Sequence, residues 1–96
     1  MAAYHLTADA DADLAALYGY SLREFGRAQA DRYFLALIDC FEMIAGNPRI
    51  GADRSTLKPG YRRFVHEAHV IYYRVRERDV LILRVLGARQ DPTRNL

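Results

Sequence analysis

A change in hydrophobic period near Gly60 is the feature of this sequence that most constrains its fold. Before Gly60, apolar residues recur at intervals of three and four in two consecutive runs, over 14–25 and 27–45. After Gly60 they recur at every second position instead. The first spacing is typical of amphipathic helices and the second of half-buried strands. Two helices followed by strands in one short chain predict an α+β fold.

The two predicted helices meet at a single glycine, Gly26, so we expect an antiparallel hairpin. Thr7 is a plausible N-cap of the first helix, and the second ends at Gly46-Asn47-Pro48. The acidic residues of the first turns suit the positive end of the helix dipole: Asp9, Asp11 and Asp13. Neither helix can bury its apolar stripe alone, so the hairpin must pack on another layer.

The strands supply that layer. A short strand is predicted at 4–6, and three more at 61–66, 69–75 and 80–86. The last three are joined by short connections, which favour an antiparallel meander. We therefore expect one domain over 1–96, of order β-α-α-β-β-β. Its hairpin should pack on one face of a mainly antiparallel sheet of three or four strands.

Arg84 interrupts the last predicted strand and decides how we assign its faces. A charged side chain is not expected beneath the helices, so alternation places Leu81, Leu83 and Val85 on the helix side. In the preceding strand, Ile71, Tyr73 and Val75 take that side. The opposite face then receives Val80, Ile82, Arg84 and Leu86 from the last strand, and Val70, Tyr72 and Arg74 from the strand before it. Such a mixture on an uncovered sheet is typical of a binding surface. The alternative is a central strand that is covered on both sides.

Charge is distributed unevenly along the chain, although the net charge is only +2. Residues 1–48 hold 3 Arg against 7 acidic residues, whereas 49–96 hold 11 basic residues against 5 acidic ones. All the basic residues except Lys58 are Arg, which binds carboxylate and phosphate through a planar fork. A GC-rich genome could explain the preference for Arg, but it does not explain why the Arg residues gather in one half.

No motif indicates a metal, a cofactor or a catalytic nucleophile. His66-Glu67-Ala68-His69 lacks the i, i+4 spacing of a helical zinc motif and falls at a predicted hairpin turn. The single cysteine, Cys40, lies among core positions of the second helix and has no base near it in sequence. One cysteine and no apolar membrane span favour a cytoplasmic protein.

The order of these segments resembles the ParE branch of the RelE/ParE toxins of bacterial type II toxin–antitoxin modules. The resemblance begins with the first strand and "LTADADADL" and continues through "EMIAGNPRIG" and "LKPGYRRF". It ends with "HVIYYRV" and "ILRVLGARQD", so it covers nearly the whole chain. It implies a small toxin that is held silent in a hetero-oligomer by a ParD-like antitoxin. Toxins of this branch are associated with growth arrest through DNA gyrase, and any DNA contact would be indirect.

RelE-like relatives instead cut messenger RNA on the ribosome, which is the alternative function. Such cleavage needs a group that removes the 2′-OH proton and another that protonates the leaving oxygen. Gly87 stands where ParE-like chains commonly show His, and no Tyr or His follows Tyr73. His66 and His69 adjoin a turn. The catalytic parts therefore look incomplete, so we expect a toxin that binds its target rather than an enzyme.

We predict no catalytic or metal-binding residues. The residues expected to bind the antitoxin or the target are Arg62, Arg63, Tyr72, Arg74, Ile82, Arg84, Leu86 and Arg89. A third possibility is a binding module that has lost its toxicity.

Overall fold

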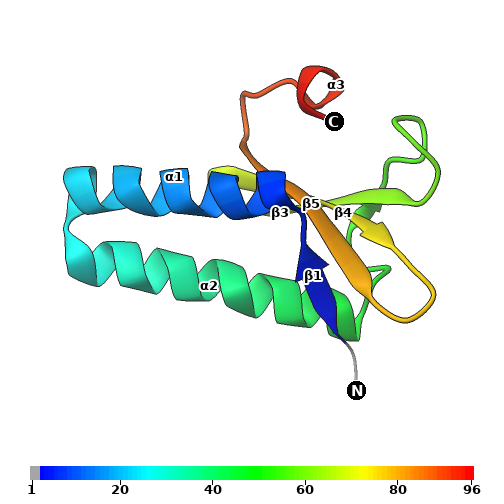
Figure 1. Cartoon of the computed structure of the whole chain (residues 1–96), viewed down its shortest axis with the longest axis horizontal. Helices are drawn as coiled ribbons and strands as arrows, with labels where there is room; N and C mark the ends of the chain where they lie inside the picture. The colour runs from blue at the N-terminus through cyan, green and yellow to red at the C-terminus, as the bar shows by residue number, and fades with distance from the viewer. Residues whose placement is uncertain (1–2) are drawn as a thin grey trace.

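The computed structural model describes residues 3–96 of the chain. Its elements in order are β1 (Tyr4–Leu6), α1 (Ala8–Phe25), α2 (Arg27–Gly46), β2 (Ala52–Asp53), β3 (Tyr61–His66), β4 (His69–Val75), β5 (Val80–Gly87) and α3 (Pro92–Asn95). The strands form one five-stranded sheet of order β1-β5-β4-β3-β2, with the α1–α2 hairpin on one face (Figure 1). The predicted α+β fold is confirmed, although the short elements β2 and α3 were not predicted.

Thr7 fixes the start of α1 and also joins it to the sheet. Its hydroxyl accepts a hydrogen bond from the backbone N–H of Ala10 at 3.0 Å, as an N-cap does. The same hydroxyl donates to the Leu83 carbonyl at 2.7 Å, and the Thr7 N–H donates to the Ile82 carbonyl at 3.0 Å. At the other end of α1, Gly26 adopts a φ of 83°, which allows the chain to reverse directly into α2.

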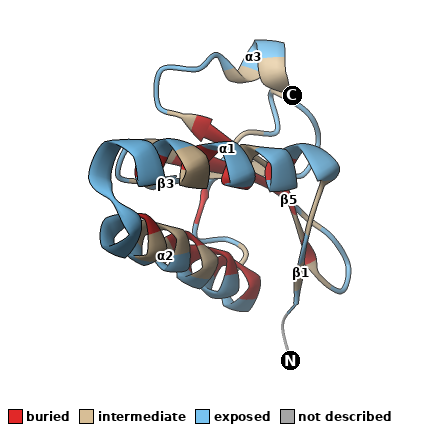
Figure 2. Ribbon diagram, turned by 60° about the vertical axis from the view of Figure 1, so that its left-hand side comes forward, coloured by how far each residue is buried: buried red, intermediate tan, exposed pale blue. Residues whose placement is uncertain are grey.

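The main core lies between the hairpin and the sheet, where the inner faces of the helices and the strands are buried (Figure 2). Its fully buried large side chains include Leu37, Phe41, Ile44, Ile71, Tyr73, Val80 and Ile82. Each helix thus buries its apolar stripe against the strands, as the hairpin required. Over residues 3–96, neither long helix is apolar enough to cross a lipid bilayer.

A β-bulge in β5 changes which of its residues face the helices. Tyr73 pairs with Ile82, whereas Tyr72 pairs with Arg84, so Leu83 is an extra residue in the ladder. The alternation of β5 therefore shifts by one position at Leu83.

The face assignment predicted for β5 is correct after the bulge and wrong before it. Val85 faces the helices and Leu86 the opposite side, as predicted. The prediction was wrong for four residues that precede the shift: Val80, Leu81, Ile82 and Leu83. Val80 and Ile82 belong to the main core, whereas Leu83 packs on the opposite face.

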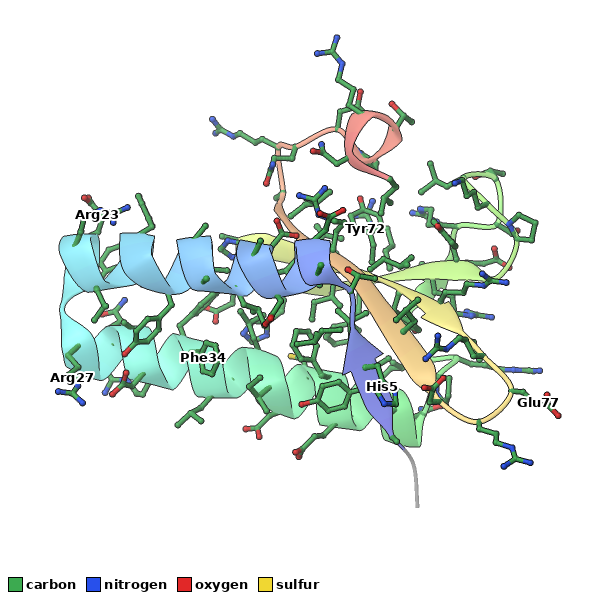
Figure 3. All side chains as sticks on the ribbon, viewed as in Figure 1. His5, Arg23, Arg27, Phe34, Tyr72 and Glu77 are labelled. Atoms are coloured by element: carbon green, nitrogen blue, oxygen red, sulfur yellow. The ribbon has the colours of Figure 1, made fainter. Side chains whose placement is uncertain are left out.

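The face of the sheet opposite the hairpin carries a second, smaller apolar cluster. The alternation predicted for β4 is confirmed, because Ile71 and Tyr73 face the helices and Val70 and Tyr72 face away. On this far face three residues are buried (Val70, Tyr72 and Leu86), and three more pack on them (Leu57, Leu83 and Leu96). Tyr72 lies on the side of the sheet toward α3 (Figure 3). The far face is therefore partly covered by the chain's own segments.

The buried hydroxyl of Tyr73 holds the loop between α2 and β3 against the sheet. It donates to the Pro48 carbonyl at 2.7 Å and accepts from the Gly51 N–H at 2.9 Å. Gly51 is buried, and a Cβ there would lie 2.6 Å from the Arg63 carbonyl oxygen. The loop can therefore approach this closely only with glycine at position 51.

Replacing Tyr73 with Phe should destabilise the fold by about 1–3 kcal/mol, because both loop groups lose their partner in a buried site. Urea unfolding followed by circular dichroism measures the change. Tyr61→Phe is the matched control, since the Tyr61 hydroxyl has no protein hydrogen-bond partner within residues 3–96. Equal midpoints for the two variants would contradict this role of Tyr73.

Candidate functional site

Arg84 and Asp13 form a bidentate ion pair between β5 and α1. The Nε of Arg84 donates to Oδ2 of Asp13 at 2.8 Å, and a terminal guanidinium nitrogen donates to Oδ1 at 2.9 Å. The other terminal nitrogen donates to the Asn95 carbonyl at 3.0 Å. The side chains of Arg84 and Asp13 are only 20% and 15% exposed. The hydrogen bonds to Asp13 raise the pKa of Arg84 above its ordinary value, so the guanidinium stays charged.

The prediction that Arg84 is available to a second macromolecule was therefore wrong. Arg84 pairs with Tyr72 in the ladder, so its side chain leaves the backbone on the far face. The guanidinium nevertheless reaches α1, where Asp13 neutralises it. The physical reason is the shortness of β1, which pairs with β5 only as far as Ile82. Beyond that point the edge of β5 is open, and Asp13 also accepts the Val85 N–H there at 2.9 Å.

Three other predicted binding residues are buried rather than presented at the surface. Ile82 is fully buried in the main core because of the bulge. Tyr72 and Leu86 lie on the expected face but are only 3% and 1% exposed. Other apolar side chains of the far-face cluster pack on them. The placement of these three side chains on an open surface was therefore wrong.

The remaining predicted arginines do not form one cluster. Arg62 is in register with Tyr73 on the helix side and donates to the Gly51 carbonyl at 2.7 Å. Arg63 and Arg74 belong to the far face, where they neighbour Tyr72 and Tyr61 in register. Arg89 is exposed and follows the opposite end of β5.

We call Tyr61, Arg63 and Arg74 together the basic sheet surface. Arg74 is exposed, and Tyr61 and Arg63 are half-buried. Within residues 3–96, neither of these arginines forms a salt bridge with a carboxylate. The two guanidinium groups are thus unneutralised positive charges beside an aromatic ring, which is a suitable surface for carboxylate or phosphate groups.

A groove of about 690 Å³ opens on the other face, between the hairpin and the β3–β4 turn, and was not predicted. We call it the hairpin groove. Its apolar lining includes Leu17, Tyr20, Phe25 and Val85, and Tyr33 and His69 line it as well. Tyr20 and Phe25 are more than half exposed, and their rings contact each other edge to face. The groove combines side chains from four segments, so no local pattern in the sequence indicates it.

The arrangement separates the groups that RNA cleavage would need to bring together. His69 lines the hairpin groove on the helix side, whereas Arg63 and Arg74 lie on the far face. A base and the cations that stabilise phosphate charge must act on the same atoms, so these residues cannot share one site. Across residues 3–96, no three His, Cys, Asp or Glu side chains converge as metal ligands.

Replacing Arg84 with Ala should lower the free energy of unfolding by about 2–4 kcal/mol, because Asp13 would be left as an unpaired, mostly buried charge. Exposed Arg89 is the matched control, and Arg89→Ala should change stability by less than about 0.5 kcal/mol. Denaturant unfolding of both variants checks this. A loss of stability as small for Arg84→Ala as for Arg89→Ala would show that the pair does not hold α1 to the sheet.

The family and several known proteins that this chain resembles are toxins. The family described as "ParE toxin of type II toxin-antitoxin system, parDE" matches residues 4–92. Toxin ParE1 of Mycobacterium tuberculosis is 35% identical over 94 residues, which are 97% of this chain and 96% of that protein. Toxin ParE1 of Caulobacter vibrioides is 42% identical over 86 residues, which are 90% and 88% of the two chains.

A solved structure agrees with these sequence relatives. The structure titled "Chromosomal ParDE TA system from P. aeruginosa" superposes with a TM-score of 0.77 and 25% identity. The superposition covers 91% of this chain and 96% of that one. The family match spans the first strand, the helical hairpin and the complete meander. The chain therefore belongs to the ParE toxin family of type II toxin–antitoxin systems.

Proposed function

We propose that this toxin arrests growth by binding DNA gyrase and that a ParD-like antitoxin neutralises it. The observation that supports binding rather than catalysis is the placement of His69 and of the pair Arg63 and Arg74 on opposite faces of the sheet. The protein would then act in the cytoplasm, where it meets gyrase. It would contact DNA only through gyrase or the antitoxin.

The basic sheet surface is the proposed site for acidic groups of the antitoxin or of the target. Of the arginines predicted to bind a partner, Arg63 and Arg74 lie on the far face without an internal carboxylate partner. Arg84, by contrast, is paired with Asp13. Arg89 is a separate, exposed contact near the end of β5. The buried residues Tyr72 and Leu86 then support this face, Ile82 packs in the main core on the helix side, and none of the three touches the partner.

An antitoxin also needs apolar contacts to bind tightly, because rim charges alone contribute little affinity. The hairpin groove offers them, with the exposed aromatic rings of Tyr20 and Phe25 at its side. A helix or strand of the antitoxin could occupy this groove while its acidic residues reach the arginines. The groove and the basic sheet surface lie on different faces, so the antitoxin would have to wrap around the toxin.

Reversing one charge on the basic sheet surface should weaken antitoxin binding. Arg74→Glu is expected to raise the dissociation constant about tenfold or more, which corresponds to about 1.4 kcal/mol. Arg32→Glu on α2 makes the same change in net charge at an exposed position of the hairpin and is the control. Titration calorimetry with the purified ParD-like antitoxin measures both. Equal weakening by the two variants would assign the effect to net charge and not to this surface.

Expression without antitoxin separates gyrase binding from RNA cleavage. A gyrase-binding toxin should induce the DNA-damage response and inhibit supercoiling by purified gyrase, while messenger RNA ends stay unchanged. Sequencing of RNA ends soon after induction provides the comparison. Codon-linked cuts would identify a ribosome-dependent nuclease, and unimpaired growth would identify a module that only binds its partner.

A further inference from the structure

Three side chains from three elements meet at one end of the hairpin groove. The Tyr33 hydroxyl of α2 lies 2.7 Å from Nδ1 of His69 in β4 and 3.4 Å from the backbone carbonyl of His66 in β3. The ring centroids of the two histidines lie 5.5 Å (His69) and 5.6 Å (His66) from that of Tyr33. Tyr33 and His69 line the groove. We call these three residues the Tyr33 cluster.

The second histidine of the cluster is only partly satisfied. Nε2 of His66 is buried and makes no hydrogen bond. The carboxylate of Glu67 lies 3.3 Å from it, but the Glu67 side chain is 68% exposed. Glu67 also has a φ of 52°, a left-handed conformation that is uncommon for a residue with a side chain. Such a φ fits the tight two-residue turn between β3 and β4, and the side chains on both sides of this turn contact Tyr33.

Besides the β4–β5 ladder, in which His69 pairs with Gly87, a further backbone hydrogen bond joins the turn to the residue after β5. The N–H of Ala88 donates to the Ala68 carbonyl at 2.9 Å, next to Gly87 and Gln90 of the groove wall. Movement of the turn away from Tyr33 would break this bond. The amide of Ala88 therefore reports whether this end of the groove is closed.

The closed arrangement favours a neutral His69. Burial lowers the pKa of His69 below its ordinary value of about 6.5, and the nearby His66 lowers it further. Burial raises the pKa of Tyr33, so its phenol keeps its proton near neutral pH. That proton can be donated to Nδ1 of His69, which then carries its own proton on Nε2.

The other charged groups near the cluster do not remove this preference. Glu67 from the β3–β4 turn is mostly exposed to water and lies against His66. Asp13 of α1, which also lines the groove, is neutralised by Arg84. Cys40 of α2, on the same helix as Tyr33, has its pKa raised by burial and remains a neutral thiol. A proton added to His69 thus enters a partly buried site that already contains a second imidazole.

We propose that Tyr33, His66 and His69 form a proton-sensitive wall of the hairpin groove, which loosens when His69 is protonated and then holds a partner segment less tightly. The wall is a property of the free toxin. Only the identity of the partner, the ParD-like antitoxin, rests on the proposed function.

The direction and the limit of the effect follow from proton linkage. Burial lowers the pKa of His69 in the closed wall, so a wall opened enough for His69 to reach water would bind more protons as the pH falls below about 6.5. Closure is therefore fully stable above that pH and weakens below it. At about one pH unit below 6.5, the ratio of open to closed molecules can rise at most about tenfold.

Hydrogen exchange of the free, full-length protein tests the wall directly. After correction for the intrinsic pH dependence of exchange, the Ala88 amide should exchange several-fold faster at about pH 5.5 than at about pH 7.5. In His69→Gln, which keeps a group able to accept from Tyr33, this change should disappear. His5→Gln, an exposed histidine on β1 that pairs with Asp79, should leave it intact.

Proton NMR of the His69 imidazole provides a second measurement on the unaltered protein, in case the glutamine variant does not fold. A midpoint of the pH titration of His69 below that of a histidine in an unfolded peptide supports the proposal. A midpoint at or above that value overturns it. Ala88 exchange that does not respond to pH, or that responds equally in His69→Gln, overturns it as well.

Antitoxin titrations at the same two pH values separate this inference from the proposed function. The dissociation constant of the wild-type toxin should rise several-fold on acidification, and that of His69→Gln should not. An antitoxin that binds at neither pH, although Ala88 exchange responds, refutes the proposed partner and leaves the wall supported. Equal pH dependence of binding for both toxins would show that the wall does not control the groove.

Discussion

The carboxylate of Asp13 is the group on which the joint between hairpin and sheet depends. It accepts two hydrogen bonds from Arg84 and one from the Val85 N–H, at the position where the ladder of β5 is disturbed by the bulge. A charge this poorly exposed is tolerated only when it is paired and hydrogen-bonded. The interaction therefore sets where α1 meets β5, and Thr7 fixes the same junction nearly two turns earlier. Arg84 extends the connection to the C-terminal segment through Asn95.

Residues 3–96 form two surfaces with different chemistry on opposite faces of the sheet. The helix side offers an apolar groove with imidazole groups, whereas the far side offers arginines around a partly covered apolar cluster. Binding by complementary shape and charge can use both surfaces at once. Proton transfer to a phosphate ester would need members of both sets at one point.

Hydrophobic period predicted most of the fold, and it failed where one residue breaks the period. The hairpin, the meander and the faces of β4 follow directly from spacing. In β5, the extra residue Leu83 moved Val80 and Ile82 to the helix side, and a bulge leaves no mark in a continuous apolar run. Arg84 was predicted to avoid the helices because the sequence does not show that Asp13 is its partner. Asp13 lies 71 residues earlier in the chain. In the sequence, its position near the start of a helix is explained equally well by the helix dipole. The groove was missed because it combines four segments that are distant in sequence.

The unequal distribution of charge gives the molecule an electrical polarity. The first 48 residues, which form β1 and the hairpin, have a balance of 3 basic to 7 acidic side chains, and the remaining 48 have 11 to 5. A strongly anionic macromolecule that approaches from solution would be repelled on one side and attracted on the other, so the toxin would rotate before contact. Added salt would then slow productive encounters more than it would shorten the life of a complex once formed.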